Sequence, residues 1–72
     1  MSKERPYQEL AKTMRLLREM KQISLRRHAK ELGFSPATLS RIERGYGCDL
    51  SKLVTIRRQT GVSYETLLGD HK

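Results

Sequence analysis

The chain has 72 residues, of which 36% are hydrophobic, with one Phe and no Trp. A chain this short forms at most one small domain with a minimal core, which leaves little room for a large enzyme pocket. Its 15 Lys and Arg outnumber its 8 Asp and Glu and give a formal net charge of +7. This charge favours a polyanionic partner, nucleic acid above all. We expect residues 1–72 to form a single domain, flexible at residues 1–5 and 70–72.

Cysteine usage and hydropathy narrow the class of protein further. The single cysteine, Cys48, excludes an internal disulfide framework, and together with the two His residues it lacks the spacing of zinc ligands. No third residue is placed to orient His28 and Cys48 for catalysis, so we do not expect an enzyme. The longest uncharged apolar stretch, residues 53–56, is too short to cross a membrane. We therefore expect a soluble, cytoplasmic protein with no cofactor, metal or small-molecule ligand.

Helix signals recur along the whole chain, and no segment shows the alternation of apolar and polar residues that is typical of a strand. Pro6 can open a first helix, and Leu10, Met14 and Leu17 then have helical spacing, which predicts a helix over residues 7–21. Four shorter helices are predicted after it, each preceded by a polar capping residue and followed by a glycine. The third helix of the chain covers residues 36–44. We expect an all-α, compact five-helix fold. The predicted caps are Ser24, Ser35, Asp49 and Ser63, and the glycines are Gly33, Gly45, Gly61 and Gly69.

Positive charge is concentrated in the middle of the chain. Residues 12–44 contain nine basic residues, most of them arginine, against three acidic ones. The planar fork of arginine suits phosphate oxygens and guanine edges. A solvated helical surface would also carry such charge, so the charge alone leaves both interpretations open.

The segment over residues 25–44 has the pattern of a helix-turn-helix unit. Two short helices joined only by Gly33, Phe34 and Ser35 are expected to cross steeply, and the small Ala29 allows them to approach closely. Residues 25–45 read LRRHAKELGFSPATLSRIERG. This segment resembles the helix-turn-helix of the Cro/CI-type phage repressors and XRE-type bacterial regulators, and the resemblance extends over nearly the whole chain.

The resemblance implies a lambda-repressor-like DNA-binding domain in a transcriptional regulator, bacterial or phage-encoded and associated with the nucleoid. In that family the arginine at the place of Arg18 pairs with the glutamate at the place of Glu43, which implies a structural salt bridge here. The sequence departs from the family at Leu25, where Gln is common, and at His28, where an aliphatic side chain is common. We expect His28 to be largely shielded from water.

The third helix is the predicted recognition helix. Leu39 and Ile42 fall on one side of it, and small or basic residues fall on the other, which would face the major groove. Thr38 can serve either face. The predicted base contacts are Ser35, Pro36, Ala37, Ser40 and Arg41.

Phosphate contacts are expected where the second helix begins and where the third ends. The free N–H groups and dipole of a helix N-terminus favour an anion, and we rank Arg26 first there. Lys12, Arg15 and Lys30 are better explained as solvated surface, and Tyr46 fits a cap on the core equally well. The predicted phosphate contacts are Ser24, Arg26, Arg27, Arg44 and Tyr46.

One recognition helix reads too few base pairs to find an operator, so we expect a homodimer on double-stranded DNA with an inverted repeat. Leu16 and Met20 form an alternative pairing surface to the predicted one near the C-terminus. The alternative function is a helix-turn-helix interaction module of the antitoxin or antirepressor type, with weak or no DNA binding. The predicted dimer interface is Val62, Tyr64, Leu67 and Leu68.

Overall fold

The computed structural model describes residues 7–69. Within that range the chain is built of α-helices without strands, which confirms the all-α prediction. The role of Pro6 in opening the first helix and the expected flexibility at residues 1–5 and 70–72 concern residues outside the described range. The helices are α1 (Gln8–Lys21), α2 (Leu25–Leu32), α3 (Pro36–Glu43), α4 (Leu50–Thr60) and α5 (Tyr64–Leu68).

Helices α2 to α5 begin at the four predicted polar caps. In each, a side-chain oxygen of the cap accepts the backbone N–H three residues ahead, which satisfies one of the amide groups that a helix N-terminus leaves unpaired. The four hydrogen bonds are Arg27 N–H to Ser24 Oγ at 3.0 Å, Thr38 N–H to Ser35 Oγ at 3.1 Å, Lys52 N–H to Asp49 Oδ1 at 3.0 Å and Thr66 N–H to Ser63 Oγ at 3.2 Å.

Helix α1 begins one residue later than predicted, at Gln8. Tyr7 precedes it without a side-chain capping bond, and its N–H donates to the carbonyl of Gly45 at 3.2 Å. A Cβ on Gly47 would lie 2.3 Å from the Tyr7 ring, so the chain after α3 passes close against that ring. The start of α1 is therefore held by the loop that follows α3.

Helix α3 ends one residue earlier than predicted, at Glu43, because the chain turns at Gly45 with φ +94°. The Gly45 N–H donates to the Ile42 carbonyl and the Tyr46 N–H to the Arg41 carbonyl, both at 3.1 Å. This pair of bonds is the Schellman motif, in which a residue with positive φ closes the helix.

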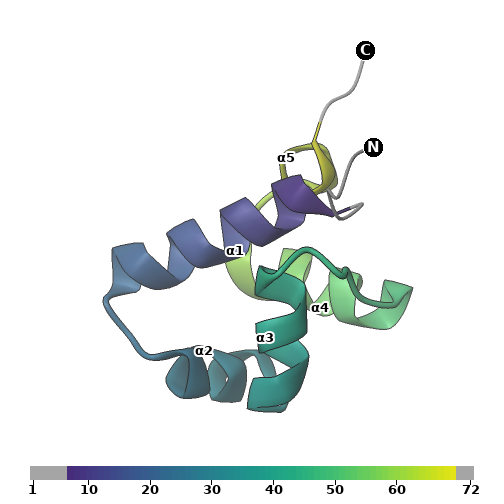
Figure 1. Ribbon diagram of the computed structural model, residues 1–72. Coiled ribbons are helices and arrows are strands. Elements are labelled where there is room, and N and C mark those ends of the chain that lie inside the picture. The colour runs from purple at the N-terminus through teal and green to yellow at the C-terminus, as the bar shows by residue number, and fades with distance from the viewer. Residues whose placement is uncertain (1–6, 70–72) are drawn as a thin grey trace, which may run out of the picture.

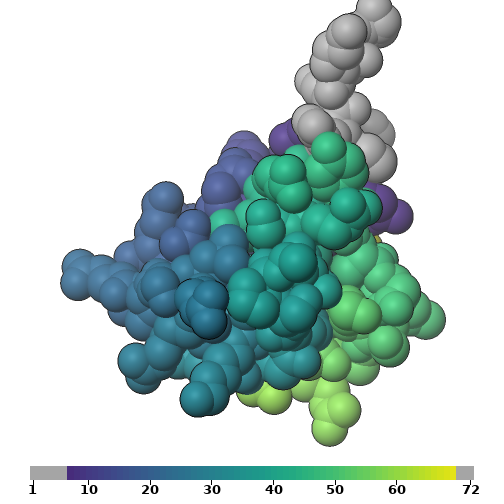
Figure 2. Space-filling view, turned by 60° about the horizontal axis from the view of Figure 1, so that its bottom comes forward, coloured from purple at the N-terminus to yellow at the C-terminus, as the bar shows by residue number. Residues whose placement is uncertain are grey.

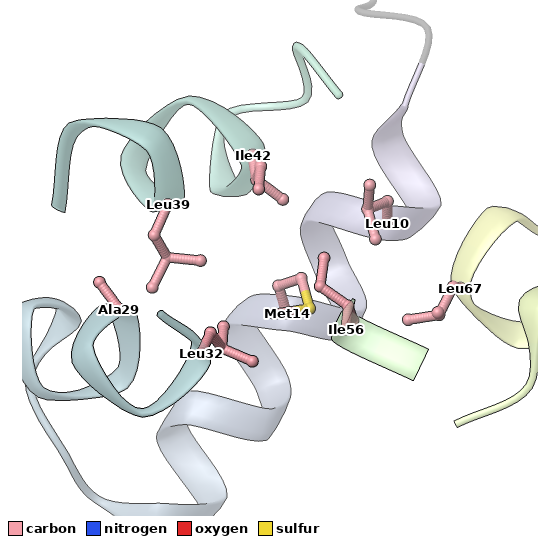
Figure 3. Packing of buried hydrophobic residues seen from close by; sticks show 8 residues of the cluster. All are labelled: Leu10, Met14, Ala29, Leu32, Leu39, Ile42, Ile56 and Leu67. Atoms are coloured by element: carbon pink, nitrogen blue, oxygen red, sulfur yellow. The ribbon is translucent and has the colours of Figure 1, made fainter. Parts of the chain in front are cut away.

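The core draws residues from all five helices and lies between α1 and the other four (Figure 3). Leu50 is apolar but 73% exposed, because it occupies the first turn of α4, at the edge of the packed region. The buried cluster comprises Leu10, Met14, Ala29, Leu32, Leu39, Ile42, Ile56 and Leu67.

Helix α1 spans the molecule, with α5 beside its first turns and α2 and α3 below it (Figure 1). Gly33, at φ +80°, makes the turn between α2 and α3, and the two helices cross steeply. In the space-filling view α2 and α3 lie side by side on one face of the molecule (Figure 2). Within residues 7–69 no helix has the length and apolar character needed to span a membrane.

Candidate nucleic-acid interface

Helix α3 has two faces of different chemistry. Leu39 and Ile42 point into the core and are fully buried. Ala37 and Arg41 are exposed, and Ser40 is half-buried. The outer face thus combines small side chains with a cation, which allows a polyanion to approach the helix closely.

The hydroxyl groups at the start of α3 are engaged in capping. Ser35 Oγ accepts the Thr38 N–H, and the two hydroxyl oxygens lie 2.9 Å apart in a further hydrogen bond. Thr38 is half-buried and its hydroxyl bonds to the capping residue Ser35, so this hydroxyl is less available to a ligand. Ser35 and Pro36 are both exposed, as a base-contacting role requires.

Arg41 and Arg44 share a partner that the sequence interpretation did not foresee. The guanidinium carbon of Arg41 lies 4.9 Å from the centroid of the Tyr46 ring, and that of Arg44 lies 5.6 Å from it. Contacts of this kind contribute about 0.5–1 kcal/mol at exposed sites. The spacing of an arginine and an aromatic residue across a helix-ending glycine is the signal that could have revealed them.

The predicted phosphate contacts at the start of α2 differ in how far they are already engaged. Arg26 is exposed and forms no ion pair within residues 7–69. Arg27 Nε lies 3.4 Å from Glu31, whose other carboxylate oxygen accepts Lys21 Nζ at 2.8 Å. The hydrogen bond from Lys21 lowers the pKa of Glu31. Arg26 is therefore the more available of the two arginines.

Surface hollows lie on both sides of α3. One, between α2 and α3, is lined by Arg26, Arg27, Lys30, Phe34 and Pro36. A second hollow lies on the other side of α3. The basic groups are Arg26, Arg27 and Lys30 in the first hollow and Arg41 and Lys52 in the second. They flank the exposed face of α3, as phosphate strands flank a helix in the major groove. Sequence reasoning missed Lys52, which reaches this region from α4 and whose Nζ lies 3.5 Å from Asp49. The second hollow is lined by Thr38, Arg41, Gly47, Cys48, Asp49 and Lys52.

The ion pair implied by the family resemblance is present between α1 and α3. Arg18 Nε and Nη2 donate to the two carboxylate oxygens of Glu43 at 2.9 and 3.0 Å. The Glu43 side chain is only 6% exposed, and the hydrogen bond to it raises the pKa of Arg18. Arg15, expected to be solvated surface, instead donates through Nη1 to the Glu43 carbonyl. Two arginines of α1 thus fix the C-terminal end of α3.

His28 is shielded from water, as expected, with 2% of its surface exposed. Burial lowers the pKa of its imidazole, so the neutral form is favoured in the folded chain. Its Nδ1 has no hydrogen-bond partner within residues 7–69. The side chain thus occupies a core position in which one of its two ring nitrogens has no hydrogen-bond partner among the described residues.

The residues of the predicted dimer interface differ in how far the fold buries them. Leu67 is fully buried against α1 and the core, so it belongs to the monomer interior and not to an exposed surface. Tyr64 and Leu68 are more than one-third exposed, and Val62 is half-buried. The Arg57 guanidinium carbon lies 5.5 Å from the Tyr64 ring centroid.

The alternative pairing surface on α1 is more exposed than the one near the C-terminus. Leu16 is 56% and Met20 70% exposed.

Cys48 is half-buried, and burial raises the pKa of its thiol, which keeps it protonated and poorly nucleophilic. In the described part of the chain no three His, Cys, Asp or Glu side chains are placed to hold a metal ion.

Comparison with known proteins agrees with this architecture. Residues 14–67, three quarters of the chain, match the family described as helix-turn-helix. No curated protein and no solved structure matches significantly. The matched segment contains α2 and α3 together with the residues of α1 and α4 that pack on them. The chain therefore belongs to the helix-turn-helix family of XRE and Cro/CI-type DNA-binding regulators.

Proposed function

We propose that this protein is a sequence-specific transcriptional regulator, a repressor, that inserts α3 into the major groove of an operator. The observation that carries the proposal is the division of α3 into a buried apolar face and an exposed face. In this orientation Ala37 meets a thymine methyl group, and Ser40 and Arg41 reach base edges, Arg41 as a fork onto guanine. Ser35 and Pro36 lie at the end of the helix that enters the groove first.

Basic side chains on both sides of α3, which we propose contact phosphates, support the same orientation. Arg26 and Arg27 stand at the N-terminus of α2, where Ser24 leaves other backbone N–H groups for an anion. Arg44 and Tyr46 lie at the opposite end of α3, and Lys52 is added to this second group. These contacts fix the position of the helix on the duplex, whereas the base contacts carry the sequence preference.

We further propose that the protein binds DNA as a homodimer through the exposed residues Tyr64 and Leu68 together with the half-buried Val62. A two-fold pair would present two copies of α3 to an inverted repeat with half-site centres about one DNA turn apart. Substitution Tyr64→Glu should then weaken binding to the full site much more than to a half-site. Leu16→Glu serves as the matched variant, because it places the same charge on the alternative surface of α1.

Selection of bound fragments from random DNA tests the proposal. The intact chain should enrich an inverted repeat, and Arg26→Ala should weaken binding to all sequences while making the logarithmic salt slope shallower by about one unit. Lys12→Ala is the charge-matched control: it removes a cation from α1, outside the proposed interface, and should change the slope less. Absence of any enriched sequence would overturn the proposal.

The exposed pair Leu16 and Met20 favours one second candidate, a helix-turn-helix module that binds a protein. In that case DNA binding would be weak, and Leu16→Glu would abolish the association of the chain with its protein partner. Enrichment of a DNA sequence by the wild-type chain, unchanged by Leu16→Glu, would exclude this candidate.

A further inference from the structure

Tyr46 lies where the helix-ending turn returns to the last residues of α3. The turn at Gly45 brings Tyr46 back so that its N–H bonds to the carbonyl of Arg41 at 3.1 Å. In a Schellman motif these two positions commonly make an apolar contact. Here the contact joins the Tyr46 ring to the guanidinium group of Arg41 at 4.9 Å.

Stacking on a ring uses the face of a guanidinium group and leaves its edge unchanged. The N–H donors of arginine lie in the plane of the group, so an arginine held over an aromatic face can still present its fork to a base. Within the described residues neither Arg41 nor Arg44 forms an ion pair with an acidic side chain. The ring contact itself uses no N–H donor. Arg44 gives one donor, its Nε–H, to the Ser40 carbonyl at 3.4 Å. Within the described residues the N–H groups of Arg41 and the remaining ones of Arg44 stay available to a DNA base or phosphate.

We propose that Tyr46 is a positioning residue for sequence readout: its ring holds Arg41 in a preorganised conformation at the end of α3. A long side chain loses rotamer freedom on binding, and an ordered one loses less. Arg44, at 5.6 Å from the same ring, is held by the second contact. This role rests on the proposed function, and it differs from the phosphate contact expected for Tyr46, which would use the hydroxyl group and not the ring.

The test compares Tyr46→Phe, which keeps the ring, with Tyr46→Leu, which removes it. On the DNA sequence selected by the wild-type chain, Tyr46→Leu should lower the preference over random DNA about three- to tenfold, and Tyr46→Phe should keep it. In the Arg41→Ala background Tyr46→Leu should have little further effect on that preference. A general folding defect would instead lower binding to specific and random DNA together.

A second measurement needs no DNA. The ring current of an aromatic side chain shifts nearby protons, so the side-chain proton resonances of Arg41 should be displaced in the wild type and in Tyr46→Phe and should return to ordinary values in Tyr46→Leu. Unchanged Arg41 resonances or unchanged DNA preference in Tyr46→Leu would overturn the assignment. So would an equal loss on all DNA sequences in Tyr46→Phe, which would identify a hydroxyl–phosphate contact.

The two proposals fail in different ways. If the wild-type chain prefers no DNA sequence while the Arg41 resonances respond to the ring as expected, the proposed function is wrong and the stacked geometry remains. If Arg41→Ala loses sequence preference and Tyr46→Leu does not, the function holds and the positioning role is wrong.

Discussion

Two pairs of arginines in this protein have the same spacing and opposite surroundings. Arg15 and Arg18 lie three residues apart on α1, and both donate to Glu43, one to its carbonyl and the other to its carboxylate. Arg41 and Arg44 lie three residues apart at the end of α3, and both lie over the Tyr46 ring. The first pair directs N–H donors to Glu43 inside the protein, whereas the second pair keeps most of its donors available, with one N–H of Arg44 given to the Ser40 carbonyl. The partner of an arginine, more than its spacing, distinguishes a structural role from a recognition role.

Removing Arg18 should have the largest effect on stability. The substitution Arg18→Met leaves the buried Glu43 carboxylate without its ion-pair partner, which we expect to cost about 3 kcal/mol. For a domain of this size that loss lowers Tm by at least about 12 °C. Thermal unfolding followed by circular dichroism measures it, and the double variant Arg18→Met with Glu43→Leu should recover most of the loss. An unchanged Tm for Arg18→Met would contradict the structural role.

Removing Arg41 should affect DNA binding and leave stability nearly unchanged. Arg41→Ala should cost about 1–3 kcal/mol on the best site, with relaxed base preference, because it deletes a forked contact. The loss of stability should be no more than about 1 kcal/mol, the contribution of the exposed contact between Arg41 and the Tyr46 ring, and well below that of Arg18→Met. Binding titrations on selected and random DNA separate the two effects. Equal losses on both would remove Arg41 from the base-reading residues.

Arg15→Ala should have a smaller effect, on stability. Its hydrogen bond ends on the Glu43 carbonyl, at the C-terminal end of α3 where the helix dipole favours a cation. We expect a loss of about 1 kcal/mol in the free energy of unfolding, measured by urea denaturation. The matched variant Lys12→Ala removes an exposed cation from the same helix and should change nothing measurable. A similar loss in both would mean that overall charge and not the carbonyl contact is responsible.

His28→Leu should have the smallest effect at neutral pH and a distinct effect in acid. Burial lowers the pKa of His28, and the charged groups nearest it are Lys21, Glu43, Glu31 and Arg18. As pH falls below the unfolded value of about 6.5, the unfolded chain takes up a proton that the folded chain resists, so stability falls. In His28→Leu this part of the decline should disappear, and stability near pH 7 should be unchanged or higher, because an apolar side chain needs no polar partner.

Urea denaturation at several values between about pH 7 and pH 5 gives both quantities for His28→Leu. An equal decline in wild type and variant would show that His28 does not titrate differently on folding. A large fall in Tm at neutral pH would show that its imidazole makes a specific stabilising contact.

The ends of the helices could be predicted from the sequence because their signals are local. A capping side chain such as Ser35 bonds three residues ahead, and a glycine such as Gly33 adopts positive φ at little cost, whatever the rest of the fold does. The end of α1 is less regular, because Gln22 and not a glycine closes it in the left-handed conformation, with φ +56°. The resemblance to the family predicted the ion pair between Arg18 and Glu43, which local signals alone do not indicate.

The contacts that could not be predicted depend on how the helices pack. Leu67 is in the core because α5 lies against α1, and nothing in its own segment distinguishes it from the exposed Leu68. In the sequence Arg15 resembles a solvated surface charge, and its hydrogen bond to the Glu43 carbonyl forms because the end of α3 lies beside α1. The role of Tyr46 depends on one turn, which brings its ring to the arginines of the preceding helix. Such contacts require the three-dimensional arrangement.

The most direct test of the proposed DNA-binding face is a map of backbone amide chemical-shift changes in the ¹⁵N-labelled intact chain on adding its selected DNA. We predict the largest changes at residues 24–27 and 35–46, where the available arginines lie, and small changes around Arg15 and Arg18. Changes centred on Leu16 and Met20, with residues 35–46 unaffected, would contradict this prediction.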